Sequence, residues 1–116
     1  MDADKARQLL EAARTRVQAA LDAARKDAEA VESEDVRDVH EPPFTEELET
    51  YLGLVETHED QLREVEEAFA RLDAGTYGIC EPCGKSIPDE RLEAVPTARY
   101  HAEHEPTDRV AAPKHA

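Results

Sequence analysis

Residues 48–72 read LETYLGLVETHEDQLREVEEAFARL, a stretch in which every third or fourth residue belongs to one mainly apolar stripe. The members of this stripe are Leu48, Tyr51, Val55, His58, Leu62, Val65, Phe69 and Leu72. The alternating spacing of three and four predicts a helix of the coiled-coil type, with its charged residues on the other faces. Gly75 follows, and glycine readily adopts the left-handed conformation that ends many helices, so we expect the helix to stop there.

A second stripe with the same spacing precedes the first, in a segment rich in alanine. Its members are Ala3, Ala6, Leu10, Ala13, Val17, Ala20, Ala24 and Val31, with one interruption at Asp27. Pro42 and Pro43 separate the two stripes, and proline disfavours one continuous helix. We expect a first helix over about residues 4–32 and a second helix with Thr45 as its N-cap. The predicted fold is therefore mostly α, an antiparallel coiled-coil helical hairpin followed by a small C-terminal module.

The charge of the chain argues against a nucleic-acid-binding surface as its main function. The sequence has 28 Asp and Glu residues against 14 Lys and Arg residues, a formal net charge of −14. Proteins that bind DNA obtain most of their affinity from Lys and Arg side chains that neutralise phosphates. No apolar run approaches the roughly 20 residues that cross a bilayer, and the acidic start of the chain does not resemble a signal peptide. We expect a cytoplasmic protein without membrane association.

The two cysteines of the chain, Cys80 and Cys83, form a Cys-x-x-Cys motif. After 17 intervening residues the sequence continues with His101 and His104, which are separated by two residues. Two thiolates and two neutral imidazoles make a closed tetrahedral shell for a structural Zn²⁺ ion, and histidines three apart can share one helix face. The spacing therefore predicts one structural zinc per chain, with these four residues as its ligands.

Two other interpretations of the Cys-x-x-Cys motif remain open from the residues alone. A redox dithiol uses the same spacing, although in a βαβ context that this sequence does not predict. A metal-free remnant of a zinc site is the second, because histidine pairs also occur by chance on solvated helices. Zinc would supply the stability that a module of about 30 residues with few large apolar side chains lacks. A closed ligand set leaves no position for a substrate water, so we do not expect an enzyme.

Three short stretches of the C-terminal module form a recognisable pattern: GTYGICEPCG at residues 75–84, IP at residues 87–88 and RLEAVPTA at residues 91–98. This pattern resembles the zinc-finger signature of the DksA/TraR family of bacterial transcription regulators. The resemblance implies a zinc finger that carries a long coiled-coil hairpin. It also implies RNA polymerase as a partner, because family members insert the hairpin into the secondary channel of the polymerase. Several members act together with the alarmone ppGpp, which is therefore a second candidate ligand, and direct sequence-specific DNA binding is not implied.

The sequence departs from the family pattern at two places. The family closes its zinc site with a second Cys-x-x-Cys, and this chain has His101 and His104 at those two positions. Family members often carry two aspartates at the hairpin tip, followed two residues later by alanine. This chain has Asp35 and Asp38, with His40 in place of the small residue. The resemblance implies that Asp35, Asp38 and His40 are the tip residues that act on the polymerase.

The predicted organisation has three parts, which are a coiled-coil hairpin over residues 1–74 with an acidic tip near 33–44, a zinc-finger module over 75–104, and a flexible tail over 105–116. Residues 29–49 hold nine acidic side chains and one arginine, so this part would be attracted to a basic channel and repelled by DNA phosphates. We expect a transcription regulator that binds RNA polymerase. The alternative is a zinc-stabilised coiled-coil adaptor, or a dimerising structural protein, with no polymerase role.

Overall fold

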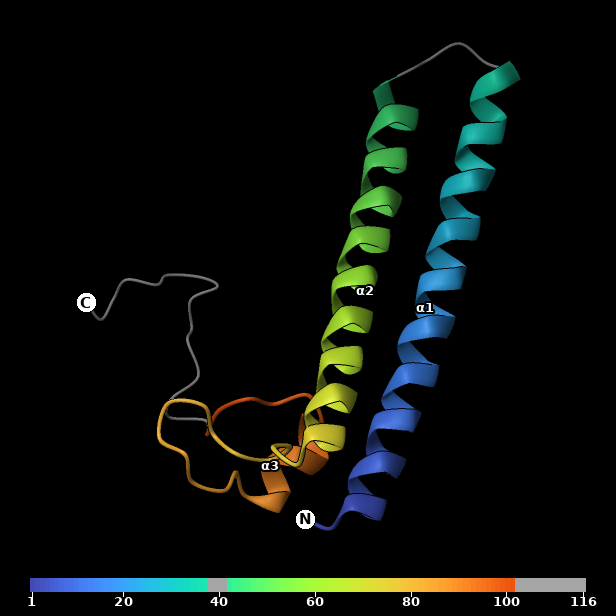
Figure 1. The fold of residues 1–116 in the computed structure, drawn as a ribbon. Coiled ribbons are helices and arrows are strands. Elements are labelled where there is room, and N and C mark those ends of the chain that lie inside the picture. The colour runs from blue at the N-terminus through green and yellow to red at the C-terminus, as the bar shows by residue number, and fades with distance from the viewer. Residues whose placement is uncertain (38–41, 102–116) are drawn as a thin grey trace, which may run out of the picture. The chain divides into compact units, whose positions relative to one another are not determined.

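The computed structural model describes residues 1–37 and 42–101, and its regular elements are helices (Figure 1). Helix α1 spans Ala3–Arg37, α2 spans Pro42–Ala74 and the short α3 spans Asp89–Ala94. An isolated antiparallel bridge pairs Ile79 with Ser86, and the described residues form no β-strand. The prediction of a mostly α fold with a small C-terminal module is confirmed. Within the described ranges, no helix is both long and apolar enough to cross a membrane.

Helix α1 ends later in the sequence than predicted, and helix α2 begins earlier. Helix α1 continues to Arg37, and α2 already begins at Pro42, so the expectation that Thr45 is the N-cap is wrong. Proline suits the first turn of a helix because the N–H groups of that turn have no acceptor within the helix. Residues 38–41, between the two helices, lie outside the described residues.

The C-terminal end of α2 agrees with the prediction. Gly75 follows the helix with φ +83°, the left-handed conformation expected of a C′ residue. Its N–H donates to the Leu72 carbonyl at 3.2 Å, and the N–H of Thr76 donates to the Arg71 carbonyl at 2.9 Å. These two bonds make up a Schellman motif, which satisfies carbonyls that have no donor inside the helix.

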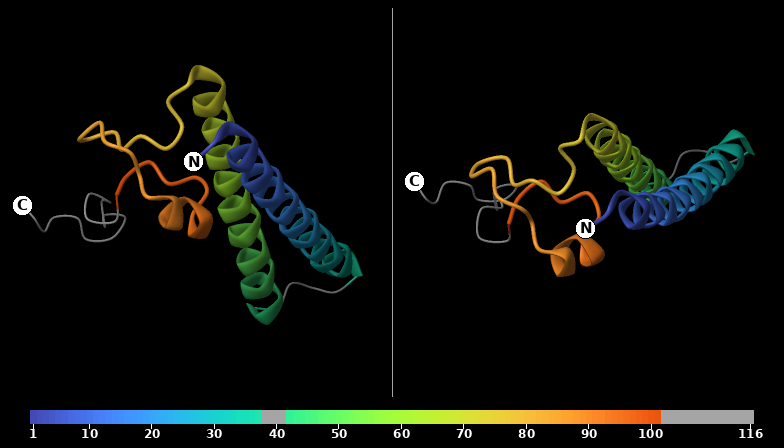
Figure 2. Two further views of the ribbon diagram at one scale, coloured as in Figure 1. Left: turned by 90° about the horizontal axis from the view of Figure 1, so that it is seen from below. Right: turned by 60° about the horizontal axis from the view of Figure 1, so that its bottom comes forward.

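The chain divides into two compact units, of which one is formed by residues 11–67. In this unit α1 and α2 lie side by side and run in opposite directions in all views (Figures 1 and 2). Two exposed ion pairs join the helices, Arg14 with Glu66 at 3.0 Å and Arg25 with Glu59 at 3.1 Å. Arg14, which precedes Arg25 on α1, pairs with Glu66, which follows Glu59 on α2, as antiparallel packing requires. Because exposed ion pairs add little stability, these two pairs mainly favour one register of the helices.

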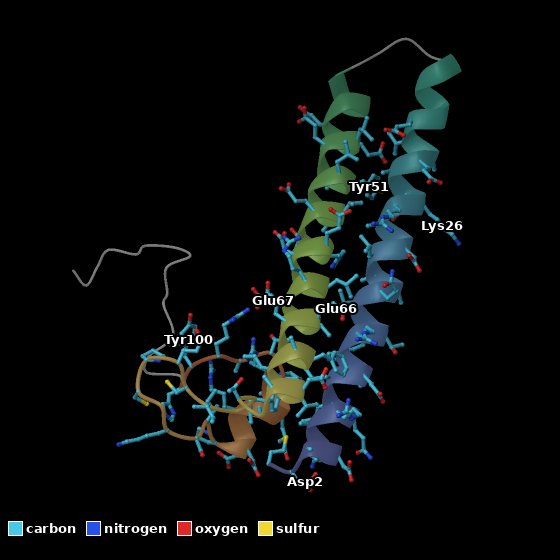
Figure 3. All side chains as sticks on the ribbon, in the orientation of Figure 1. Asp2, Lys26, Tyr51, Glu66, Glu67 and Tyr100 are labelled. Carbon is cyan, nitrogen blue, oxygen red and sulfur yellow. The ribbon has the colours of Figure 1, made fainter. Side chains whose placement is uncertain are left out.

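The predicted stripe residues that belong to this unit are all at least partly buried, whereas Ala3, a predicted member at the start of α1, is exposed. On α2, every predicted position is at least partly buried, and Figure 3 shows Tyr51 between the two helices. On α1, Leu21 (1% exposed) is more buried than its predicted neighbour Ala20, and Ala28 (5% exposed) is buried beside the exposed Asp27, where the predicted stripe is interrupted. The buried positions of α1 therefore follow the 3.6-residue period of a straight helix more closely than a strict heptad.

The other unit comprises residues 1–10 together with the chain from residue 68 onward. The part of this unit that follows α2 has a small core of four residues, each at most 6% exposed, with Tyr77 and Tyr100 packed against it. The four are Cys80, Ile87, Leu92 and Ala98. An ion pair between Lys5 of α1 and Glu93 of α3, at 3.4 Å, joins the first turns of the chain to this part.

We predict that Leu21→Ala destabilises the helical hairpin by about 3 kcal/mol, because removing a fully buried leucine side chain loses its burial energy and leaves a cavity. The matched control is Leu52→Ala on α2, where the leucine is 45% exposed, and the expected change is within about 0.5 kcal/mol. Urea unfolding followed by far-UV circular dichroism measures both variants. Equal losses of stability in the two variants would contradict the interface described above.

Candidate metal centre

Cys80 and Cys83 lie on a tight turn that two backbone hydrogen bonds close. The N–H of Cys80 donates to the Lys85 carbonyl at 2.8 Å, and the N–H of Gly84 donates to the Cys80 carbonyl at 2.7 Å. Cys80 is buried in the small core, whereas Cys83 is exposed. We call residues 79–86 the cysteine turn. These local bonds hold the two cysteines in one compact turn.

His101 joins the two cysteines from a segment distant in sequence. The imidazole and the two thiols offer ligand atoms that all lie within 4.8 Å of one another. Zn²⁺ binds thiolate sulfur at about 2.3 Å and imidazole nitrogen at about 2.0–2.1 Å in tetrahedral sites, so three such atoms can surround one ion. The donor set and its spacing therefore fit zinc, in agreement with the zinc predicted from the sequence.

The fourth predicted ligand, His104, lies outside the described residues, and its assignment stays a prediction. His101 lies in no helix of the described residues, and the helix face expected to carry His101 and His104 reaches beyond them. Helix α3 ends at Ala94, and Pro96 follows two residues later. Proline disfavours continuation of the helix. The chain after Pro96 is instead held by hydrogen bonds from other parts of the protein.

The segment that leads to His101, residues 96–101, is held by four hydrogen bonds to its backbone carbonyls. We call this segment the ligand arm. The donors and their acceptor carbonyls are the Tyr77 hydroxyl to Pro96 (2.7 Å), Arg71 Nη2 to Thr97 (3.3 Å), the Glu81 N–H to Arg99 (3.0 Å) and Arg91 Nε to Tyr100 (2.8 Å). Because the donors come from α2, α3 and the chain between them, the position of the ligand arm is fixed by several elements at once.

Helix α3 packs directly against the chain before the cysteine turn. Gly78 has φ +82°, and a Cβ atom there would lie 3.4 Å from Cδ1 of Leu92, a contact that leaves little room for a larger side chain. Leu92 itself is 1% exposed and shares the small core with Cys80. The positive φ therefore favours glycine at this position, and Leu92 of α3 limits the space beside it.

The residues that hold the ligand arm were not identified as functional from the sequence. Tyr77 and Arg91 both stand in the motif stretches quoted above, where they are visible only as residue types. Their acceptors are backbone carbonyls, and any residue type supplies a carbonyl, so no side-chain pattern marks the partner. Only the folded chain shows which donors meet which carbonyls.

Burial raises the pKa of the Tyr77 hydroxyl above its ordinary value of 10.0, and the nearby Arg71 guanidinium lowers it by a smaller amount. The neutral hydroxyl is also the form that donates to the Pro96 carbonyl. Burial and hydrogen bonding therefore both favour the protonated side chain in the folded protein.

Tyr77→Phe removes this donor, and we expect it to lower the free energy of unfolding by about 1 kcal/mol near neutral pH. The raised pKa means that the hydroxyl's contribution is fully present below the unfolded-state pKa, about 10, and is lost as pH rises through the folded-state value. The stability difference between wild type and Tyr77→Phe should therefore shrink in alkaline solution. Urea unfolding across a pH series measures it, and a difference that grows with pH would contradict the assignment.

Comparisons with known proteins agree with this geometry. The family described as "Prokaryotic dksA/traR C4-type zinc finger" matches residues 75–100. The solved structure of transcription factor DksA2 from Pseudomonas aeruginosa is similar, with a TM-score of 0.77 and 30% sequence identity, over 87% of this chain and 78% of that chain. An uncharacterised protein of Aquifex aeolicus is 45% identical over 74 residues, which are 64% of this chain and 50% of that protein. The RNA polymerase-binding transcription factor DksA of Caulobacter vibrioides is 40% identical over 53 residues, 42% of this chain and 37% of that protein.

A pair of long antiparallel helices combined with a zinc finger defines a class of helical-hairpin zinc-finger proteins. Within that class, this chain belongs to the DksA/TraR family. The matched stretches span half the length of the Aquifex relative and less of the Caulobacter one. The family description specifies four cysteines, whereas this chain has two, and the matched residues end at Tyr100, directly before His101.

We predict that the purified protein contains about one zinc ion per chain and that Cys83→Ala loses most of it, because the thiolate is a direct ligand. Ser86→Ala, in the same cysteine turn but outside the ligand set, is the matched control and should keep the metal. Elemental analysis by mass spectrometry measures the zinc content. Zinc affinity should fall as pH falls, since protons compete for the ligand atoms. Full zinc content in Cys83→Ala would refute the site.

Proposed function

We propose that this protein is a transcription regulator that binds RNA polymerase and inserts the acidic end of its helical hairpin into the secondary channel. The observation that carries the proposal is the similarity to DksA2 of Pseudomonas aeruginosa, which covers 87% of this chain and so includes far more than the zinc finger. The zinc finger has a structural role in this proposal, since two cysteines and two histidines fill all four positions of a tetrahedral site.

The charge of the helical hairpin supports this function. Between residues 46 and 67, α2 has one arginine, Arg63, and nine acidic side chains, all of them exposed. The nine are Glu46, Glu47, Glu49, Glu56, Glu59, Asp60, Glu64, Glu66 and Glu67. Figure 3 shows Glu66 toward α1 and Glu67 on the side of α2 away from it. Such a surface speeds association with a basic channel and is repelled by nucleic-acid phosphates.

Asp35, Asp38 and His40 are the residues to which we assign action near the catalytic centre of the polymerase. Asp35 belongs to the last turn of α1, and Asp38 and His40 lie outside the described residues. Carboxylates are ligands that Mg²⁺ prefers, and polymerases hold Mg²⁺ through carboxylates and substrate phosphates. Aspartates delivered to that place would alter transcription without any reaction of their own. We also propose ppGpp as a ligand of the complex, on the family similarity alone.

The decisive variant is Asp35→Asn combined with Asp38→Asn, which removes two charges and keeps the side-chain shape. We expect it to abolish the effect on transcript yield and to leave polymerase binding within about threefold of wild type, because in the proposed complex most of the contact area would lie along the hairpin and the finger. Asp22→Asn combined with Asp27→Asn is the matched control. These two exposed aspartates lie on α1 before Asp35, and their substitution makes the same change in net charge.

In vitro transcription and a pull-down of core RNA polymerase measure the two effects separately. A wild-type protein that neither binds the polymerase nor changes transcript yield would refute the proposed function and favour the adaptor alternative. A double variant at Asp35 and Asp38 that is as active as wild type would refute only the role of those two aspartates. Loss of activity in the control as well would show that overall charge, and not the tip, is responsible.

A further inference from the structure

The two carbonyls directly before His101 accept hydrogen bonds from groups that are not metal ligands. Arg91 Nε donates to the Tyr100 carbonyl at 2.8 Å, and the Glu81 N–H donates to the Arg99 carbonyl at 3.0 Å. The Arg99 side chain also forms an ion pair with Glu81, with Arg99 Nη1 3.3 Å from Glu81 Oε2. Glu81 lies between the two cysteines in sequence, so the ligand arm is tied to the cysteine turn itself.

Arg91 connects the same point of the ligand arm to the core. It is part-buried on α3, next to Leu92, which is 1% exposed and packs in the core that contains Cys80. The position of α3 relative to Cys80 is therefore fixed by apolar packing. The hydrogen bond from Arg91 on α3 therefore fixes the Tyr100 carbonyl relative to this core. His101 is the next residue, so its backbone is held as well.

A histidine ligand makes the position of this backbone more important than a cysteine would. The imidazole nitrogen stands farther from the backbone than a cysteine sulfur does, so a small rotation of the ligand arm moves the ligand atom farther. A chain that is already held in the binding conformation loses less conformational freedom when the metal binds. Groups that orient metal ligands commonly contribute 10- to 100-fold in metal affinity.

We propose that Arg91 is a positioning residue of the metal site, which holds the Tyr100 carbonyl through its Nε–H and thereby keeps His101 beside the two thiols before a metal ion binds. This inference goes beyond the proposed function and does not depend on polymerase binding. It rests on the assignment of His101 as a ligand, and the experiment below includes a variant that tests that assignment separately.

Three substitutions of Arg91 separate its hydrogen bond from its charge. In Arg91→Gln the amide nitrogen occupies the same place along the side chain as Nε of arginine, so the donor stays and the charge is lost. Arg91→Met has a carbon atom at that place and loses both donor and charge. Arg91→Lys keeps the charge but moves the donor one atom farther out. The hydrogen-bond mechanism predicts that only Arg91→Gln preserves metal binding.

The readout is the affinity of the full-length protein for Co²⁺, measured by the visible absorption of the thiolate-bound ion. Arg91→Gln should bind within about threefold of wild type, and Arg91→Met and Arg91→Lys should bind about tenfold more weakly. Arg63→Met, at an exposed arginine of α2 outside the finger, should bind as wild type does. Far-UV circular dichroism of each variant checks that the long helices stay folded.

Hydrogen exchange of the Glu81 amide in the metal-free protein gives a second, independent readout. Because this N–H donates to the Arg99 carbonyl, it should be protected from exchange in metal-free wild type and in Arg91→Gln, and less protected in Arg91→Met. A Glu81 amide that exchanges at the unfolded rate in metal-free wild type would overturn the proposal, whatever the variants do.

The remaining outcomes also decide the matter. Equal weakening in Arg91→Gln and Arg91→Met would show that a donor at the ε position does not preserve metal binding, which overturns the proposal. If His101→Ala weakens Co²⁺ binding while all three Arg91 variants bind like wild type, His101 is a ligand and the positioning role is refuted. If His101→Ala binds Co²⁺ as wild type does, the ligand assignment and the positioning role both fail.

Discussion

The metal centre of this protein depends on the hydrogen bond between the Glu81 amide and the Arg99 carbonyl, because this bond joins the cysteine turn to the ligand arm. Cys80 and Cys83 are brought together by local backbone bonds, but His101 comes from a separate segment and needs such a link. The core beneath has only four buried residues, among them a cysteine and an alanine. So small a core buries too little apolar surface to fix the segment by itself, which leaves that role to hydrogen bonds and metal ligation.

The helical hairpin follows a different physical rule, in which one apolar stripe on each helix supplies most of the stability. The stripe on α1 consists largely of alanines, and Leu21 is a large side chain that is almost fully buried there. Small side chains allow two helices to pack closely while burying limited area. The remaining surface of α2 is free to be strongly acidic, and it is this exposed charge that the proposed function uses.

Two histidines in place of two cysteines change the electrostatics of a family zinc site without changing its predicted ligand count. Four thiolates around Zn²⁺ leave a net charge of −2, whereas two thiolates and two neutral imidazoles leave a neutral centre. In a chain whose formal net charge is −14, a centre with the predicted ligand set would add no further repulsion. The proposed role of Arg91 belongs to the same adaptation, since a longer ligand side chain requires a more firmly held backbone.

The sequence by itself determined the helical class, the end of α2 at Gly75, the stripe of α2 and the meeting of Cys80 with Cys83. All of these depend on residues near one another in the chain, whose spacing and conformational preferences are visible in the sequence. Only the tertiary structure decided that Leu21 and Ala28 are buried on α1, because the choice between neighbouring positions depends on the partner helix. It also decided the path of the ligand arm, whose hydrogen bonds run from distant side chains to backbone carbonyls that every residue type possesses.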